Sequence, residues 1–598
     1  MITPMNKYSF ILLSGEQNGL LEKLQEVGLV DITRSAKPMD DTSHKLSGEI
    51  ELINGLIQGL NKAVIPEGTK PVAYNGEGSE DLVRLAGGTL MLLSEAENAV
   101  VELKKRELDL IAWGSFDKDI LDKLAAAGVP IHFHRVSAKS FQDAWKEAYP
   151  LSVISRKGGN VYFVIAGEDN LPGEVSVPTG DHNAVHAQLL EEKKNLKRLQ
   201  GEILSMKEQL PELERRREEA YAKLDLYLAG AAAVPAAENT IVTLVGYAPV
   251  ENDQTVTAAL EATGAFYLKE EAVVEDNPPI KLENNWFVRQ FEVLTDMYGR
   301  PGYDGFDPTP FISVFFLLFF AFCMGDCGYG LILIVMGLLL KKVDSFKDMA
   351  PLVVLLGIGT TVIGFLFHTF FSMDISTWSI FAPIKGIFLP AKIAGYDGTM
   401  VLALIVGVVH LCLAMCVKTY QETKNKGFVN ALGTWGWTLL IVGGIIVAAL
   451  AFAGVMDKDL TKWVVIVLGV VSALGIFVFN DMKRNKLANV GVGLWNTYNT
   501  ATGLLGDVLS YLRLYALGLA GSMLGMAFNN IATMVLGDGS KAYLWIPFVV
   551  IVIIGHTLNI AMAALGAFVH PLRLNFLEFF KNSGYEAAGR NYHPLKKF

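Results

Sequence analysis

The chain has 598 residues, too many for one ordinary domain, and 51% of them are hydrophobic. Its mean hydropathy of +0.35 is high for a soluble protein and indicates a membrane part. Residues 309–598 carry 20 Lys and Arg against 13 Asp and Glu, a net charge of +7, whereas residues 1–308 carry 31 against 48, a net of −17. An acidic half joined to a basic, apolar half argues against nucleic acid as a partner.

The first residues predict a small α/β lobe. Lys7–Leu13 reads as a strand, Gln17–Val27 as an amphipathic helix and Val30–Thr33 as a second strand. The opening stretch MITPMNKYSFILLSGEQ lacks a basic region before a long apolar core, so it does not read as a secretory signal. We therefore expect the N-terminal half to stay in the cytoplasm.

Two heptad stretches, at about 43–111 and 182–228, predict an antiparallel coiled-coil hairpin that forms a rod. The first has a seam of Leu46, Ile50, Ile53, Ile57, Leu60 and Val64. In the second, the a positions are Leu189, Leu196, Ile203, Leu210, Arg217 and Leu224, and the d positions are Glu192, Leu199, Met206, Leu213 and Ala220. Pro211 should kink this helix. Between the two stretches, 131–137 and 160–167 read as strands.

After the rod, Thr240–Val245 and the helix Gln254–Gly264 suggest a second α/β lobe. The sequence contains no GxxxxGK[ST] loop and no recognisable pair of catalytic carboxylates, so we expect residues 1–308 to be a cytoplasmic scaffold without a nucleotide site or cofactor. The four cysteines lie in apolar segments without a completing set of ligands, which favours packing over a metal site.

Residues 309–598 predict an α-helical membrane domain with eight transmembrane helices, of which the last two are long and tilted. The apolar segments fall near 309–324, 326–340, 350–371, 399–417, 432–453, 463–480, 495–535 and 543–578. With eight spans, the basic loops lie on the cytoplasmic side, namely Lys341, Lys342, Lys347, Lys418, Lys424, Lys426, Lys483, Arg484 and Lys486. Seven spans would place every basic loop after the first hairpin outside, against the positive-inside rule.

Arg513 lies in the middle of the apolar stretch Gly506–Gly521, which reads GDVLSYLRLYALGLAG. An arginine at mid-bilayer costs about 2.5–3.5 kcal/mol and usually faces an internal pathway or a partner. Asp507, six residues earlier, is about 240° around the helix, so a same-face pair is disfavoured. About two mainly apolar turns separate Arg513 from either end, which disfavours snorkelling. The pattern indicates a functional arginine.

Polar residues follow the face of this arginine and of Arg573 in the last helix. Asn499, Thr502 and Gly506 lie within about 40° of Arg513 on the N-terminal side. Asn559, Gly566 and His570 share the face of Arg573, while His556 is about 100° away and is equally well explained as a hydrogen-bonded membrane histidine. The candidate lining residues are Asn499, Thr502, Asp507, Ser510, Tyr511, His556, Asn559, His570 and Glu578. For Asp326, capping of the second helix is favoured over a place in an ion vestibule.

Four ordered motifs carry a resemblance to a known family. They are FEVLTDMYGRPGYDGFDPTPF at 291–311, GDCGYG at 325–330, SYLRLYALGLAG around Arg513 and HPLRLNFLEFF at 570–580. Together they resemble the membrane half of the a subunit of V/A-type rotary ATPases, called subunit I in prokaryotes. The N-terminal half is similar in architecture more than in letters.

The resemblance implies a stator that translocates H⁺ or Na⁺ through two half-channels, with ATP hydrolysed or made on another chain. Arg513 and Arg573 would make each carboxylate of a proteolipid c/K ring release its ion. The implied partners are that ring, peripheral-stalk subunits of E/G type, a central-rotor cap of C/d type and the lipid bilayer. Eukaryotic relatives carry a glutamate and a histidine where this chain has Ala563 and Gly521, which leaves His556 and Asn559 as substitutes.

A rival interpretation is a secondary transporter or channel with a cytoplasmic coiled-coil regulatory domain, in which Arg513 binds an anionic substrate. Such proteins are typified by inverted or parallel repeats and broken helices at mid-membrane. No convincing repeat relates the two halves of the span set. The modest length and short outside loops favour a prokaryotic cell membrane, with both termini in the cytoplasm.

Overall fold

The computed structural model describes all residues except 35–39, 74–77, 115–117, 168–170, 176–181, 237–239, 344–345, 378–379, 381–382, 384–385, 387, 391, 394, 480–485, 538–540 and 598. The chain forms two compact units. Unit 1 comprises Met1–Phe10, Leu29–Asp31 and Val245–Pro594, and unit 2 comprises Ile11–Gly28, Ile32–Leu244 and Leu595–Phe598. The segment from residue 245 onward therefore groups with the membrane helices, ahead of the boundary predicted at 308.

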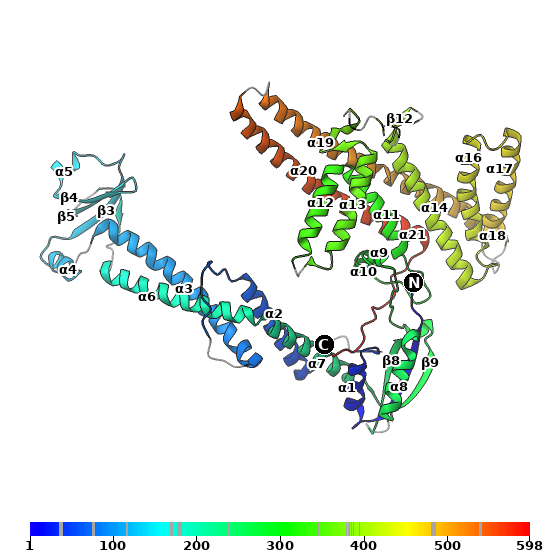
Figure 1. Ribbon diagram of the computed structural model, residues 1–598, viewed down its shortest axis with the longest axis horizontal. Coiled ribbons are helices and arrows are strands. Elements are labelled where there is room, and N and C mark those ends of the chain that lie inside the picture. Colours follow the sequence, from blue (N-terminus) through cyan, green and yellow to red (C-terminus); the bar gives the residue numbers. More distant parts are fainter. Residues whose placement is uncertain are drawn as a thin grey trace. The chain divides into compact units, whose positions relative to one another are not determined.

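The helices of unit 2 are α1 (Gln17–Val27), α2 (Asp41–Lys62), α3 (Gly78–Trp113), α4 (Lys118–Ala126), α5 (Trp145–Ala148), α6 (His182–Glu208) and α7 (Leu210–Ala231). Helix α3 runs along α6 and α2 runs along α7 (Figure 1). Their shared core includes Ile53, Leu60, Leu82, Ile203, Met206 and Leu213. Many apolar positions of both heptad stretches thus meet in one core. Val64, predicted for the seam, is instead exposed, because α2 ends at Lys62.

The long predicted helix 182–228 is two helices. The chain turns at Gln209, and Pro211 lies in the first turn of α7. A proline lacks the N–H that an interior position needs, but the first turn has no use for that donor. The kink expected near Pro211 corresponds to this interruption of the helix at Gln209.

Unit 2 also holds an antiparallel sheet of order β4-β5-β3-β6. Its strands are β3 (Ile131–Ser137), β4 (Leu151–Lys157), β5 (Asn160–Ala166) and β6 (Glu174–Val175). Strands β3 and β5 match the two predicted strands. Strand β4 was not predicted, because its positions alternate between half-buried and exposed and its sequence LSVISRK gives only a weak apolar pattern.

A second sheet has the order β2-β8-β1-β9, with β7 paired to β8. Its strands are β1 (Met5–Leu13), β2 (Asp31–Ile32), β7 (Val234–Ala236), β8 (Ile241–Pro249) and β9 (Phe266–Glu271). Strands β1 and β8 contribute residues to both units. Helix α8 (Asp253–Thr263) follows β8, and α9 (Trp286–Arg289) and α10 (Glu292–Tyr298) precede the membrane helices. The two α/β lobes predicted at either side of the rod thus share one sheet.

The first three apolar helices are α11 (Thr309–Met324), α12 (Cys327–Leu340) and α13 (Ala350–Leu366), and α12 packs along α13 (Figure 1). They are followed by α14 (Gly398–Lys426), α15 (Leu432–Thr438), α16 (Gly444–Phe452), α17 (Lys458–Ala473), α18 (Lys486–Ser510), α19 (Leu512–Leu536), α20 (Trp545–Arg573) and α21 (Phe580–Ser583). Short hairpins β10 (Thr369–Phe370) with β11 (Met373–Asp374), and β12 (Lys392–Ile393) with β13 (Tyr396–Asp397), lie between α13 and α14.

Among the described residues, five helical segments are long and apolar enough to cross a membrane, and α11, α12 and α13 are shorter apolar helices. The chain is therefore a multi-pass membrane protein. Each of the eight predicted segments is an apolar helix, although length and composition alone qualify five of them as spans. Two of the basic loop residues, Lys483 and Arg484, lie outside the described residues.

Candidate functional site

The two longest apolar segments run over Asn489–Leu536 and Ala542–Ser583, with 48 and 42 residues. About 20 residues suffice to cross a bilayer, so both segments are long enough to lie strongly tilted or to extend beyond it. Helices α19 and α20 pack against each other (Figure 1). The predicted long final helices are therefore present, and each contains an irregularity beside its arginine.

Arg513 is the second residue of α19, just after Tyr511 separates α18 from α19. Its side chain is half-buried, and within the described part of the chain it makes neither an ion pair nor a hydrogen bond, with Nη1 buried. His570 and Glu578 of the last segment lie within electrostatic reach. Arg513 therefore places on a membrane-length helix a cation that has no direct partner among the described residues.

The predicted lack of pairing between Arg513 and Asp507 is confirmed. The Asp507 carboxylate accepts a hydrogen bond from Asn582 Nδ2 at 2.8 Å and lies 3.3 Å from Lys581 Nζ. Asp507 and Asn499 line a cavity of about 340 Å³ between α14, α15, α18 and α21. Thr502 and Ser510 instead bond to carbonyls of their own helix, at Tyr498 and Gly506.

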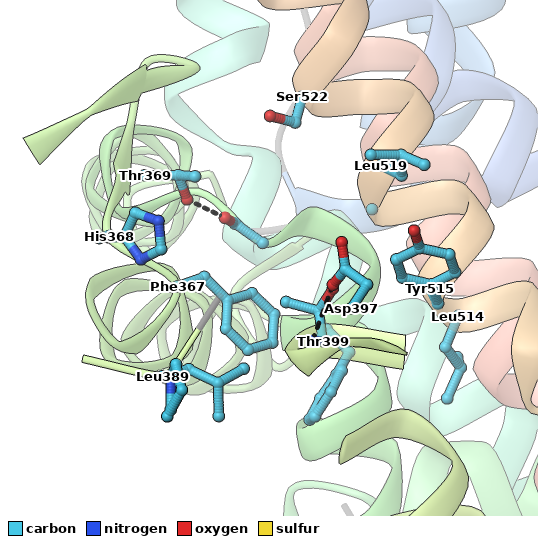
Figure 2. A pocket seen from close by; sticks show the side chains of 14 residues that line it. Phe367, His368, Thr369, Leu389, Asp397, Thr399, Leu514, Tyr515, Leu519 and Ser522 are labelled. Atoms are coloured by element: carbon cyan, nitrogen blue, oxygen red, sulfur yellow. Dashed lines mark hydrogen bonds between the residues drawn. The ribbon is translucent and has the colours of Figure 1, made fainter. Parts of the chain in front are cut away.

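A second cavity, of about 200 Å³, lies beside the first turns of α19 (Figure 2). Helix α19 contributes Leu514, Tyr515, Gly518, Leu519 and Ser522. The opposite wall comes from the ends of α11 and α13 and from the segment before α14. In Figure 2 the side chains of Tyr515 and Asp397 point toward one another across this cavity.

His556 and Asn559 meet in a buried polar network with Tyr329 of α12 and Asn529 of α19. Tyr329 Oη lies 2.7 Å from His556 Nδ1, and His556 Nε2 lies 2.9 Å from Asn529 Oδ1. Asn529 Nδ2 donates to the Phe371 carbonyl, so its Oδ1 faces the imidazole as an acceptor. Both ring nitrogens of His556 are thus occupied, as the hydrogen-bonded alternative predicted.

Asn559 completes this network. Its Nδ2 donates to Tyr329 Oη and to the carbonyl of Gly521, both at 2.8 Å. At Gly521, an asparagine from the neighbouring helix thus reaches the backbone. The network ties α12, α19 and α20 together.

Asp326 is a structural acid, as predicted. Its carboxylate caps α12 by accepting from Gly328 N and Tyr329 N, and it also accepts from Phe371 N and Ser372 N. Phe371 and Ser372 have positive φ values of 49° and 58°, a conformation that non-glycine residues adopt rarely. Four N–H donors to one carboxylate hold this turn in place.

Arg573 is exposed at the end of α20 and, among the described residues, makes no ion pair. The next residues, Leu574–Phe579, form a π-helix, an irregularity that is frequent at functional sites. His570 is half-buried with Nδ1 unpartnered, and Glu578 is buried with Oε2 unpartnered, again within the described residues. Pro571 is contained in α20, and the helix changes type three residues later.

Sequence reasoning missed three residues that shape the site. Lys581 pairs with Asp507, Tyr329 bonds His556, and His410 of α14 lies 2.9 Å from Tyr511 Oη. Tyr511 itself is fully buried, so its side chain belongs to the helix core. The histidine in the apolar run ALIVGVVHLCLAM was a visible signal for a buried polar contact. No group of three metal-ligating side chains occurs among the described residues.

The fold and site define a multi-pass membrane protein whose residues 1–308 form α/β and helical structure. One of its membrane-length helices carries an arginine that has no hydrogen bond or ion pair among the described residues. The sequence profile of the V-type ATPase 116kDa subunit family matches residues 173–382 and 501–597, slightly more than half of the chain. The chain therefore belongs to the V-type ATPase 116kDa subunit family. The matched ranges include Asp326, Arg513 and Arg573.

Curated relatives agree with this assignment. The chain is 31% identical over 350 residues to the A-type ATP synthase subunit I of Methanocaldococcus jannaschii, covering 54% of this chain and 49% of that one. It thus spans about half the length of this relative. It is 24% identical to the V-type ATP synthase subunit I 1 of Treponema pallidum, with 100% of both chains covered. A crystal structure of the cytoplasmic N-terminal domain of a subunit I covers 45% of this chain at 15% identity, with a TM-score of 0.21 that says nothing about the fold.

Proposed function

We propose that this protein is the stator of the membrane sector of a V/A-type rotary ATPase or ATP synthase. It carries H⁺ or Na⁺ across the membrane against a ring of proteolipid subunits, and another chain hydrolyses or makes ATP. Family membership supports the assignment to this class of complex. The observation that carries the mechanism is Arg513, a half-buried cation without a hydrogen bond or an ion pair among the described residues.

The missing counter-charge is a membrane carboxylate of the ring. Lipid desolvates such a carboxylate and favours its neutral, ion-loaded form, whereas a fixed cation favours the ionised form. A carboxylate that reaches Arg513 therefore releases its ion. Ala516 and Ala520 lie one and two turns beyond Arg513 and are exposed, and such small residues allow a partner helix to approach closely.

The two cavities support two offset half-channels. The cavity at Asn499 and Asp507 precedes Arg513 along the chain, and the cavity at Gly518 and Ser522 follows it. Arg513 between them blocks a direct leak, because its positive charge repels a cation that has not been handed to the ring. Ion transfer from one cavity to the other then requires rotation of the ring.

The orientation follows the loop charges. Eight spans with both termini in the cytoplasm of a prokaryotic cell put Lys341, Lys418 and Lys424 inside, as the positive-inside rule requires. The cavity at Asp507 then opens to the cytoplasm and the cavity at Ser522 to the outside. Residues 1–308 with their helical rod bind the peripheral stalk (E/G type) and the central-rotor cap (C/d type).

The test is ATP-driven ion uptake in vesicles that hold the whole complex. We expect Arg513→Ala to abolish uptake while complex content, measured by immunoblot, stays normal. Arg513→Lys keeps the charge but loses the planar donor fork and should rescue little. Arg573→Ala should be milder, because Arg573 is exposed and water can screen it.

Lys541→Ala, which removes an exposed loop cation, is the matched control and should leave uptake unchanged. Near-normal uptake by an assembled Arg513→Ala complex would remove this arginine from the mechanism and favour a scaffold.

A further inference from the structure

His410 on α14 is a fully buried histidine that the proposed mechanism does not use. Aromatic rings surround it: Phe315 at 4.2 Å, Phe319 at 5.1 Å and Phe579 at 4.8 Å between ring centroids. Its Nδ1 lies 2.9 Å from Tyr511 Oη, and its Nε2 has no partner among the described residues. The hydrogen bond to Tyr511 is thus the polar contact that distinguishes this ring from a phenylalanine.

The hydrogen bond to Tyr511 offsets part of the cost of burying this histidine. A buried polar atom without a partner costs about 1–3 kcal/mol, whereas one hydrogen bond returns about 0.5–1.5 kcal/mol. A phenylalanine would fill the same aromatic surroundings without an unpaired Nε2, but it would leave the buried Tyr511 hydroxyl without this hydrogen bond. The hydrogen bond to Tyr511 is therefore what the histidine adds to this packing.

That bond is made at the junction between α18 and α19. Tyr511 N donates to Val508 O, and Leu514 N donates to Tyr511 O, so the chain tightens from α-type to i→i−3 bonding. Gly407, one turn before His410, makes room for the ring of Tyr511, because a Cβ at residue 407 would lie 2.3 Å from Tyr511 Cγ. Gly407 and His410 of α14 therefore both contact Tyr511 at the junction. Tyr511 lies two residues before Arg513.

The same histidine contacts the segment of the second arginine. Its ring stacks on Phe579 with an interplanar angle of 9°. Phe579 ends the π-helix that starts directly after Arg573. One side chain thus touches both helix irregularities that lie next to the membrane arginines.

We propose that His410 is a positioning residue for both arginines, fixing the α18–α19 junction through Tyr511 and the π-helix through Phe579. This inference rests on the proposed function of Arg513 and Arg573, and it adds a residue outside the two arginine helices to that site. Without the hydrogen bond, the junction is free to relax toward regular helix, which would rotate Arg513 away from the ring carboxylate.

The test combines a distance and a transport measurement. Spin labels on cysteines at Ala516 and Val569, both exposed, report the separation of α19 and α20 by pulsed electron resonance in a background without native cysteines. We expect one narrow distance distribution for the parent chain and a broadened or shifted one for Tyr511→Phe and His410→Phe. Ion uptake per assembled complex should fall about tenfold in both variants.

Three comparisons separate positioning from packing. The double variant Tyr511→Phe/His410→Phe should be no worse than either single variant, because both delete the same bond. His410→Asn, which offers a polar atom near the position of Nδ1, should retain more ion uptake than His410→Ala. Thr360→Val removes a buried hydroxyl on α13 that bonds only within its helix and should change neither measurement.

An unchanged distance distribution together with normal uptake in Tyr511→Phe would overturn the proposal. If the complex with His410→Phe does not assemble, Tyr511→Phe still tests the proposal, because it removes the same hydrogen bond by deleting a single oxygen atom. The distance measurement needs no transport, so it remains informative even if Arg513→Ala shows that the proposed function is wrong.

Discussion

At the scale of single residues, the site depends on where polar groups are satisfied and where they are not. Asp326 accepts four backbone N–H groups and His556 has both ring nitrogens occupied, so these residues hold structure. Arg513 is the opposite case, since its guanidinium has no partner among the described residues. Buried polar groups are normally paired, so an unpaired one calls for an explanation, and for Arg513 the proposed explanation is a group on another chain.

We predict that Asp326→Asn lowers stability without affecting Arg513 directly. An amide has one accepting oxygen, and its NH₂ group would face the buried Ser372 N–H, now 2.6 Å from Oδ2. An unpaired buried donor costs about 1–3 kcal/mol. The measurement is the melting temperature of the purified protein in detergent. Asp374→Asn, at an exposed acid that accepts from Ser376 N, is the control; an equal loss in both variants would contradict the prediction.

We predict that the stability of α8 depends on pH through the carboxyl group of Asp253. Hydrogen bonds from Lys269 and then from Tyr8 lower the pKa of this carboxyl below its ordinary value. Because the folded pKa is lowered, its stabilising effect is present above the unfolded value of about 3.9 and is lost as pH falls through the folded pKa. Hydrogen exchange in α8, corrected for intrinsic rates, should therefore accelerate below about pH 4.

Asp253→Asn cannot ionise, so its exchange in α8 should lack this acid-dependent step. Glu261→Gln, on the exposed side of the same helix, should retain it. Identical pH profiles for the parent chain and Asp253→Asn would show that this carboxyl does not stabilise the helix.

At the scale of elements, the rod of unit 2 depends on apolar side chains from helices far apart in the sequence. Ile203 on α6 is fully buried in the core that α2, α3, α6 and α7 share. Ile203→Asp would bury a charge without a partner, at a cost of several kcal/mol. We expect faster proteolysis within residues 78–231 and loss of complex assembly, while membrane insertion stays normal. Lys197→Asp, on an exposed position of the same helix, is the control.

The sequence was sufficient for elements whose signals are local. Hydropathy predicts the apolar helices. A rotation of 100° per residue places Asp507 and Arg513 on different faces of a helix. The hydrogen bonds that build the site join residues far apart: the residue numbers differ by 101 for His410 and Tyr511 and by 227 for Tyr329 and His556. Strand β4 escaped prediction for a similar reason, since pairing with β5 rather than its own pattern stabilises it.

At the scale of the whole molecule, the proposed mechanism needs groups from this chain and from a partner chain. The described residues provide a cation and two cavities, and in the proposed mechanism the moving carboxylate belongs to a partner. Coupling then depends on keeping the two cavities on opposite sides of the membrane. The topology of the membrane helices is therefore the property on which the proposed mechanism depends most.

Eight spans predict which loops an impermeant thiol reagent reaches. In a background without the four native cysteines, Lys541→Cys, in the loop before α20, should react from outside intact cells. Lys424→Cys, near the end of α14, should react only after permeabilisation. Both positions are exposed, so access to the reagent depends on the membrane rather than on protein packing.

Val455→Cys, in the loop between α16 and α17, tests the same topology independently, because its side chain is 71% exposed and eight spans put it outside. If Val455→Cys and Lys541→Cys are labelled from the same side, the chain crosses the membrane an even number of times between the two loops. The helix α17 and the α18–α19 segment supply these two crossings. If α11 and α12 formed one span, all three positions would change sides together. Labelling of Lys424 from outside, with Val455 and Lys541 protected, would therefore contradict eight spans with a cytoplasmic N-terminus and place the Asp507 cavity on the outer side.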